Sequence, residues 1–256
     1  MNLARYLPTD CLKPFVKEFL IVESIAETGN RVLPDTSIVL AFRFKGTVVE
    51  SGETNSNLPV SVITGLRKSS RVLNYSANSS TLLVLFREGG AAAFFREPLH
   101  ELFSQSRPLD ELIQPQKLEE VEDRLAGAKT NPQRIAIIEQ FLISKRLRSG
   151  PEPLLAQAVM SIKIAHGKTG IKSLAESLSI SQDAFEKRFR KAVGTSPKQF
   201  AELVRFRYLI TAQSADRSLT DLAYEAGYFD QAHFIKDFRT FTGQAPQDFF
   251  KSALFW

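Results

Sequence analysis

Cysteine and long hydrophobic runs are scarce in this 256-residue chain, and each shortage excludes a class of protein. The single cysteine, Cys11, excludes an internal disulfide and a cysteine-rich zinc site, and it fits a free thiol in a reducing cytoplasm. No apolar stretch approaches the roughly 20 residues of a membrane span. No signal peptide is visible at the amino terminus. We therefore expect a cytoplasmic protein with no membrane partner.

A large charge of one sign is also missing. The chain has 33 Lys and Arg against 28 Asp and Glu, a net charge of +5. Residues 151–256 contain 14 basic and 11 acidic residues, so the mild excess is shared with residues 1–150. Such a balance permits an anionic partner without requiring one. With 43% hydrophobic residues, the chain is typical of a globular protein rather than a disordered one.

The C-terminal half contains an internal repeat. Five residues recur at an offset of 49 positions: Phe185, Phe189, Gly194, Pro197 and Phe200 match Phe234, Phe238, Gly243, Pro246 and Phe249. Just upstream, LAESLSI matches LAYEAGY at an offset of 48, so one loop differs by a single residue. Helical periodicity alone explains recurring phenylalanines but not a glycine and a proline at the same offset. The repeat therefore predicts two copies of one structural unit.

The second copy predicts a short helix, a tight turn and a longer helix. Thr220 is the expected N-cap of the short helix, and Gly227 ends it because glycine tolerates the left-handed backbone of such a turn. Asp230 then caps the longer helix, whose buried stripe is Phe234 and Phe238. The repeated glycine ends this helix, and the repeated proline opens the next. This order is the helix-turn-helix pattern.

The first copy follows the same plan with weaker local signals. Ser179 stands in the place of the turn glycine, whereas Ser181 is a good cap for the longer helix and Ser196 for the helix after it. Residues 198–214 predict a long amphipathic helix that joins the copies, and residues 154–167 predict another before the first copy. We therefore expect an all-α domain of seven helices with two helix-turn-helix units.

Opposite the paired phenylalanines, the longer helix of each copy presents a polar face. The predicted DNA-contacting residues are Gln182, Asp183, Glu186, Lys187, Arg190 and Lys191 in the first copy, and Gln231, Ala232, His233, Lys236 and Arg239 in the second. A helix fits the major groove, where Arg and Lys contact guanine, Gln pairs with adenine, and other basic groups contact phosphate. A solvated face explains the charges of any single helix. Two equivalent faces at a fixed spacing instead suit adjacent major grooves about 34 Å apart.

These motifs resemble the AraC/XylS family of bacterial transcription regulators. The segment AYEAGYFDQAHFIKDFRTFTGQAPQDFF follows the family signature, and the resemblance covers about residues 153–250. It implies a seven-helix domain whose two recognition helices enter successive major grooves of double-stranded DNA. By position, it implies base reading by Asp183, Glu186, Lys187 and Arg190, and then by Gln231, Ala232, His233 and Lys236. The two acidic groups depart from the expected pattern, so the first helix prefers cytosine donors or contributes little.

The N-terminal part has a different pattern. Short β-branched and aromatic runs are separated by the turn signals GN, PD, SGETNSN, RKSS and NSS, which predicts an antiparallel sheet or a barrel. The runs are residues 15–26, 36–46, 58–65, 71–77 and 80–88, and helices are expected at 98–105, 116–128 and 131–148. Asn131 is the expected cap of the last helix, and residues 148–153 are the expected linker. The predicted fold is α+β, with a β-rich, barrel-like domain over 1–148 and the helical domain over 149–256.

This layout resembles AraC-type regulators that carry a β-rich sensory or dimerisation domain, which implies a small-molecule effector. We assign no effector-binding residue, no cofactor and no metal site. His100 is the sole histidine of this domain and is expected to be a surface or packing residue. Arg43, Arg67, Arg71 and Arg87 lie in or beside the predicted strands, where they face either an anionic ligand or solvent.

Besides DNA, the sequence suggests two further partners, and it leaves two rival functions to be weighed. The apolar residues of the last N-terminal helix either pack on the sheet or pair with a second protomer, which leads to the hypothesis of a homodimer through residues 116–148. RNA polymerase is a candidate partner. A helical module that binds protein is one rival, and an enzyme with an attached DNA-targeting domain is another. No nucleophile elbow, P-loop or dinucleotide motif supports the enzyme. We therefore expect a transcription regulator and not an enzyme.

Overall fold

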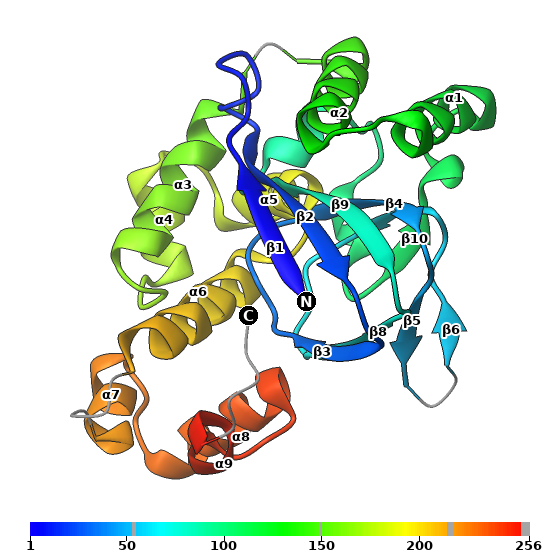
Figure 1. Cartoon of the computed structure of the whole chain (residues 1–256). Helices are drawn as coiled ribbons and strands as arrows, with labels where there is room; N and C mark the ends of the chain where they lie inside the picture. The colour runs from blue at the N-terminus through cyan, green and yellow to red at the C-terminus, as the bar shows by residue number, and fades with distance from the viewer. Residues whose placement is uncertain (53–54, 149, 214–217, 252–256) are drawn as a thin grey trace.

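A computed structural model describes residues 1–52, 55–148, 150–213 and 218–251. Glu53 and Thr54 of one predicted turn, and Ser149 of the predicted linker, lie outside these ranges. Figure 1 shows the strands gathered in the N-terminal half and the helices of the C-terminal half ranged along one side of them and beneath. This arrangement confirms the predicted α+β class.

Two antiparallel sheets make up the β-rich part. The larger has the order β1-β2-β9-β4-β7-β10, and the smaller has the order β3-β8-β5-β6. The larger sheet contains Asn2–Tyr6 (β1), Val16–Ser24 (β2), Ser79–Phe86 (β9), Val39–Lys45 (β4), Ser61–Thr64 (β7) and Ser106–Pro108 (β10). The smaller contains Thr28–Val32 (β3), Arg71–Tyr75 (β8), Val48–Ser51 (β5) and Ser56–Asn57 (β6). In the described part of the chain no strand pairing joins the two sheets, so the barrel is not closed.

One predicted turn is wrong. Gly29 and Asn30 lie inside β3, where they pair with Asn74 and Leu73 of β8. The turn preference of this dipeptide is local, whereas pairing with a neighbouring strand satisfies its backbone groups, and the tertiary pairing prevails. Each of the five predicted strand runs does contain a strand.

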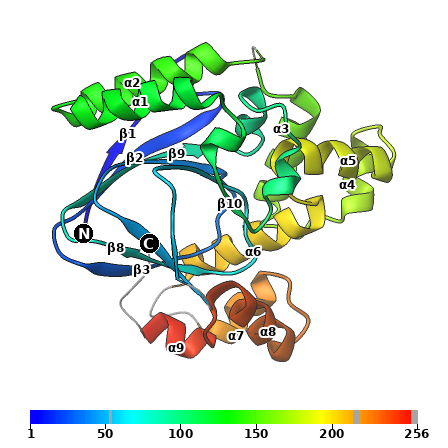
Figure 2. The ribbon, with the colours of Figure 1, turned by 90° about the vertical axis from the view of Figure 1, so that its right-hand side faces the viewer.

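The two faces of the larger sheet have different surroundings because successive side chains of a strand point to opposite sides. One face is tightly packed, and eight of its side chains are fully buried: Phe19, Ile21, Leu40, Phe42, Ile63, Leu82, Val84 and Phe86. Helices α1 (Pro115–Gly127) and α2 (Asn131–Lys145) cover this side of the domain, as Figure 2 shows. The other face is turned toward the smaller sheet.

Helix α2 packs its apolar side on the sheet, which is one of the two predicted alternatives. Ile138 and Leu142 are buried, and the Phe141 ring lies edge-on to Phe42 with 6.0 Å between the centroids. The predicted cap was wrong by one residue. The Thr130 side chain accepts the backbone N–H of Gln133, and the Gln133 side-chain oxygen accepts the backbone N–H of Thr130, so a capping box begins the helix.

A short 3-10 helix replaces the longer helix expected over residues 98–105. Leu99–Leu102 forms η2, between η1 (Gly90–Ala93) and η3 (Leu109–Glu111). Pro98 immediately precedes η2, and Ser104 has a left-handed backbone with a φ of 59°. A single tight turn therefore fits between these residues and a longer helix does not.

Seven helices follow in the described part of the C-terminal half, as predicted. They are Pro153–Ile164 (α3), Ile171–Ser177 (α4), Gln182–Val193 (α5), Pro197–Ala212 (α6), Leu219–Glu225 (α7), Gln231–Thr242 (α8) and Pro246–Lys251 (α9). Helix α6 joins the two repeat copies and buries Phe200, Leu203, Phe206 and Leu209. Every helix in the described ranges is too short or too polar to cross a membrane.

Candidate nucleic-acid interface and cavity

The turn between the two helices is the same in both repeat copies. In the first, the Ile180 N–H donates to the Ala175 carbonyl over 3.1 Å, and in the second the Tyr228 N–H donates to the Ala223 carbonyl over 3.0 Å. The residue before each donor has a left-handed backbone: φ is 54° at Ser179 and 84° at Gly227. The serine therefore adopts the conformation that the glycine of the other copy accepts without strain.

The longer helices α5 and α8 also begin and end alike. Ser181 and Asp230 are their N-caps, and each side chain accepts a backbone N–H of the first turn. Gly194 and Gly243 end them with φ of 98° and 76°. The short helix α7 is capped by Ser218, whose hydroxyl accepts the Thr220 N–H, so the predicted Thr220 cap was wrong by two residues.

The paired phenylalanines form the same packing motif twice. In the first copy the ring centroids of Phe185 and Phe189 are 5.6 Å apart, and Phe189 lies 5.5 Å from Phe200. In the second, the corresponding distances are 5.7 Å and 5.1 Å, from Phe238 to Phe234 and to Phe249. Phe185 and Phe234 are 0% and 2% exposed. Burial of these stripes turns the opposite face of each helix outward.

On α5, five of the six predicted contact residues are exposed: Gln182, Asp183, Lys187, Arg190 and Lys191. Glu186 is half-buried, and one of its carboxylate oxygens accepts a 2.9 Å hydrogen bond from the Gln182 side-chain amide. Gln182 and Glu186 are therefore hydrogen-bonded to each other on the helix surface. The basic groups lie toward the C-terminal half of the helix.

On α8, all five predicted residues are exposed: Gln231, Ala232, His233, Lys236 and Arg239. The His233 ring packs edge-on to Tyr228, and its Nε2 lies 3.5 Å from an Asp237 carboxylate oxygen. Gln231 donates to the Thr220 hydroxyl over 2.6 Å, which links the start of α8 to α7. Lys236 and Arg239 are exposed, and no ion pair with another described residue holds either side chain.

Sequence reasoning missed one exposed side chain beside this face. Phe229 is 89% exposed and immediately precedes the Asp230 cap of α8. A large apolar residue in a turn between two polar-faced helices was the available signal, because turns ordinarily carry small or polar residues. Phe229 therefore adds an exposed apolar side chain at the N-terminal end of α8.

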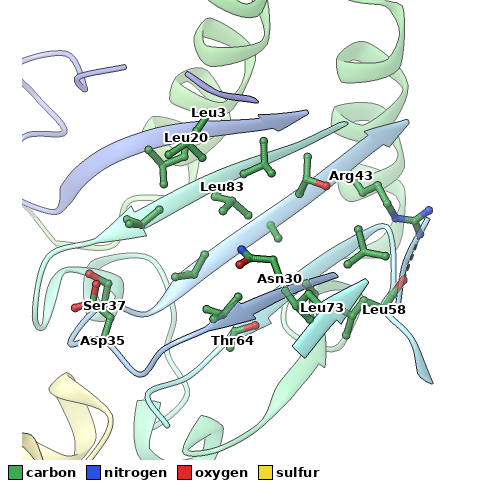
Figure 3. Close-up of a pocket in the computed structure, with 18 of the residues that line it drawn as sticks. Leu3, Leu20, Asn30, Asp35, Ser37, Arg43, Leu58, Thr64, Leu73 and Leu83 are labelled. Atoms are coloured by element: carbon green, nitrogen blue, oxygen red, sulfur yellow. Dashed lines mark hydrogen bonds between the residues drawn. The ribbon is translucent and has the colours of Figure 1, made fainter. Parts of the chain in front are cut away.

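A cavity of about 310 Å³ lies between the two sheets, on the side of the larger sheet that is turned away from α1 and α2. Figure 3 shows it lined by alternate residues of facing strands. Its apolar walls include Leu3, Leu20, Val22, Val39, Ala41, Leu58, Val62, Leu73, Leu83 and Leu85. A volume and lining of this kind are typical of small-molecule sites.

Two of the residues that line the cavity have a buried hydroxyl group with no hydrogen-bond partner in the described part of the chain. These groups are Ser37 Oγ and Thr81 Oγ1, and their residues are 6% and 4% exposed. A buried polar group left unpaired costs about 1–3 kcal/mol. Polar atoms of a bound molecule would remove that cost. Ser37 lies beside Asp35 at one end of the cavity, and Arg43 lies at the other, as Figure 3 shows.

Arginines reach the cavity from several elements. Arg5 is paired with Glu18 at 3.2 Å, Arg71 with Glu50 at 3.3 Å, and Arg43 donates to the Leu58 carbonyl over 3.2 Å. Of the four arginines that the sequence singled out, Arg43 and Arg71 line the cavity. The other two are not among its lining residues: Arg67 pairs with Glu50 at 3.2 Å, and Arg87 donates to the Lys13 carbonyl.

One lining residue comes from the helical domain. Arg207 of α6 lines the cavity, and its Nε lies 3.9 Å from a carboxylate oxygen of Asp35. His100, which the sequence placed on a surface or in packing, is half-buried in η2 and is not among the lining residues. No local pattern in the sequence marks the cavity, because its walls come from strands that are far apart along the chain.

Two families match the chain in separate regions. A family described as "Helix-turn-helix domain" matches residues 174–252, which contain both repeat copies. A family described as "Domain of unknown function (DUF6597)" matches residues 4–108, which contain the two sheets and the cavity. The two matches fall on the two parts that the fold separates.

The chain is similar to curated transcription regulators. It is 28% identical over 123 residues to the Msm operon regulatory protein of Streptococcus mutans, which covers 45% of this chain and 43% of that protein. It is 29% identical over 80 residues to the HTH-type transcriptional activator RhaS of Citrobacter koseri, covering 30% of this chain and 28% of RhaS. The chain thus spans less than half the length of the curated relatives that it matches.

One solved structure aligns with most of the chain at low identity. A crystal structure of ToxT from Vibrio cholerae aligns with a TM-score of 0.46 and 11% identity, over 93% of this chain and 97% of ToxT. The matched helix-turn-helix family covers the repeat, its shared turns and its paired polar faces. Residues 174–252 are therefore a helix-turn-helix domain, and over part of its length the chain is similar to transcription regulators of the AraC type.

Proposed function

We propose that this protein is a cytoplasmic, sequence-specific transcription regulator in which α5 and α8 read adjacent major grooves of one DNA duplex. The supporting observation is that the repeat builds two units with the same turn, caps and phenylalanine packing, each with an exposed polar helix face. Residues 149–256 form the DNA-binding domain in this proposal. Residues 1–148 form the sensory domain, and the protein is not an enzyme.

The proposed contact surface consists of the exposed residues of the two helices. It contains Gln182, Asp183, Glu186, Lys187, Arg190 and Lys191 on α5, and Gln231, Ala232, His233, Lys236 and Arg239 on α8. Gln182 and Glu186 are hydrogen-bonded to each other, and their side-chain oxygens together can accept a hydrogen bond from the amino group of cytosine. Guanine is then contacted by the basic groups of the helix. Ala232 can only make an apolar contact, such as one with a thymine methyl group. Basic residues at the helix ends contact phosphate.

Selection of bound duplexes from a random pool, with the full chain at a stated salt concentration, tests the proposal. We expect enrichment of a site with two half-sites about 10 base pairs apart, centre to centre. Footprinting on genomic DNA should then show discrete recurring sites. A pool that stays random after repeated rounds would exclude sequence-specific reading and favour a helical module that binds protein.

We propose further that the cavity between the sheets holds the effector. Its apolar walls suit a small molecule with an apolar body, and the unpaired Ser37 and Thr81 hydroxyls suit polar atoms on that molecule. The described lining residues include five basic ones (Arg5, Lys17, Arg43, Arg71 and Arg207) and two acidic ones (Glu18 and Asp35), and Glu50, outside the lining, pairs with Arg71. This excess of positive charge favours an anionic end. Native mass spectrometry of the purified full chain should detect a bound organic anion.

Two further partners belong to the proposal. A homodimer through residues 116–148 would use mainly polar contacts, because most of the apolar side of α2 is buried on the sheet and α1 exposes Glu119, Glu120 and Asp123. Ile143 and Leu147 are the exposed apolar residues of this segment that it could add. Light scattering at high protein concentration tests it, and a monomer mass would contradict it. RNA polymerase remains a candidate partner at activated promoters, for which a bacterial two-hybrid assay is the direct test.

A further inference from the structure

The sheet domain holds the C-terminal end of α8 through hydrogen bonds. The Ser70 N–H donates to the Phe241 carbonyl over 2.8 Å. The Ser70 hydroxyl and the Arg31 Nη1 both donate to the Thr242 carbonyl, over 3.1 Å and 2.9 Å. Three donors from the sheet domain therefore converge on the last two carbonyl groups of the second reading helix.

The chemistry of a helix end explains why these contacts hold α8 in a defined direction. The last carbonyls of a helix have no partner within the helix, and they form the negative end of its dipole. A guanidinium group there satisfies an acceptor and neutralises part of that charge. Gly243 turns the chain away at φ 76°, and a Cβ added to it would lie 3.2 Å from Arg31 Nη1. The Arg31 side chain is thus closely fitted against the end of α8.

The first reading helix meets the same domain at the equivalent point of the repeat. Gly194, which ends α5, is buried, and a Cβ added to it would lie 3.3 Å from the side chains of both Ile38 and Leu66. Gly194 and Gly243 are the matching glycines of the two copies. The sheet domain therefore fixes α5 by apolar packing and α8 by polar bonds, each at its C-terminal end.

We propose that Arg31 and Ser70 are positioning residues for DNA recognition: by holding α8 relative to α5, they set the distance between half-sites that the protein accepts. The inference rests on the proposed function, since it requires both helices to read DNA. Neither residue lies on an exposed face of a reading helix, so they act through α8 and not by touching DNA. A change in affinity alone would not separate this role from a general loss of structure, and the preferred spacing does.

The test compares the selected site with a version carrying one extra base pair between its half-sites, bound by the full chain in a mobility assay at fixed salt. The wild-type protein should prefer the selected spacing by about tenfold or more, because one base pair rotates the second half-site around the duplex. Arg31→Ala should lower that ratio at least threefold, mainly through weaker binding to the selected spacing. Arg31→Lys, which keeps a charged donor, should restore most of the ratio. Ser70→Ala should lower it less, because the backbone donor is kept.

Several results would overturn the inference. An unchanged ratio for Arg31→Ala, with affinity either kept or lowered equally on both duplexes, would mean that the contact does not set the spacing. Tighter binding by Arg31→Ala to the selected site would mean that the contact holds α8 away from DNA. If the wild-type protein selects a two-part site, but Arg31→Ala leaves the spacing ratio unchanged or binds the selected site more tightly, this inference fails and the proposed function stands. If the wild-type protein selects no site, the proposed function fails and this inference fails with it.

Discussion

At the scale of single residues, Ser179 carries a backbone cost that its repeat partner avoids. Its φ of 54° is left-handed, as is the 84° of Gly227 at the equivalent position. A side chain in that region costs about 1–2 kcal/mol, partly offset by the greater flexibility of glycine in the unfolded chain. We expect Ser179→Gly to raise the free energy of unfolding by about 0.5–1 kcal/mol in urea titrations.

A matched control separates the turn from a general effect of glycine. Ser177 is the last residue of α4, where the backbone is helical. Ser177→Gly should lower the free energy of unfolding by a few tenths of a kcal/mol up to about 1 kcal/mol. Equal destabilisation by Ser179→Gly and Ser177→Gly would show that the left-handed backbone at Ser179 does not destabilise the first copy.

Lys236 is the residue on which the DNA-reading role of α8 is most directly tested. It is exposed on the polar face of α8, opposite the buried Phe234 and Phe238. Lys236→Ala should weaken binding to the selected site about tenfold, because one base or phosphate contact is lost, while the unfolding transition stays unchanged. A mobility assay at fixed salt measures the affinity. Lys45→Ala, at an exposed residue that ends β4, is the control and should bind like the wild type.

At the scale of elements, the end of β9 is tied to α3 across the domain boundary. Glu88 follows β9, accepts the Thr36 hydroxyl, and pairs with Lys163 of α3 at 2.8 Å. Burial by itself would raise the pKa of Glu88, but the hydrogen bonds and charge of Lys163, with Thr36 and the Glu88 backbone, outweigh it and lower that pKa. The ionised carboxylate is therefore the form that joins the two domains.

The lowered pKa of Glu88 determines in which direction the stability contributed by this contact changes with pH. A carboxyl group with a lowered pKa in the folded state stabilises the protein above its unfolded-state pKa and loses that contribution as the pH falls through the folded-state value. We expect Glu88→Gln to cost about 1 kcal/mol at pH 7, a modest value because Lys163 is 47% exposed. The difference from the wild type should shrink toward zero in acid. Thermal unfolding from pH 7 down to pH 3 measures it, and a constant difference would contradict the assignment.

At the scale of the whole molecule, strand β3 lies between the cavity and α8, the second of the helices proposed to read DNA. Asn30 and Val32 line the cavity, whereas Arg31, between them, bonds to the end of α8. Alternation along a strand puts these neighbours on opposite faces. Figure 2 shows β3 and β8 on the side of the domain that faces α7, α8 and α9. A molecule that shifts β3 from inside therefore moves the group that holds α8.

Filling the cavity tests its role as the effector site. Leu83 of β9 is half-buried and lines the cavity, so Leu83→Trp should occupy part of its volume of about 310 Å³. We expect the variant to lose the anion seen by native mass spectrometry and to stop responding to it in the DNA-binding assay. Ile25→Trp, at a residue that is 81% exposed and not among the lining residues, should keep both. Retention of the anion by Leu83→Trp would place its site elsewhere.

Local patterns carried the prediction of the helical domain. The seven helices, the caps at Ser181 and Asp230 and the buried phenylalanine stripes depend on interactions within a few residues, so periodicity and capping preferences are enough to locate them. The misplaced caps at Thr220 and Asn131 lie within two residues of the observed ones, since neighbouring polar residues compete for one role.

The twin helix-turn-helix units and their outward polar faces could be predicted from local signals, because every signal involved acts over a turn or two of helix. The other features depend on tertiary contacts. The pairing of Gly29 and Asn30 into β3, the cavity between the sheets and the hold of Arg31 on α8 all join segments far apart along the chain. Such contacts depend on which strands become neighbours. The free energy that favours one strand pairing over another comes from the whole core, so no local pattern in the sequence predicts it.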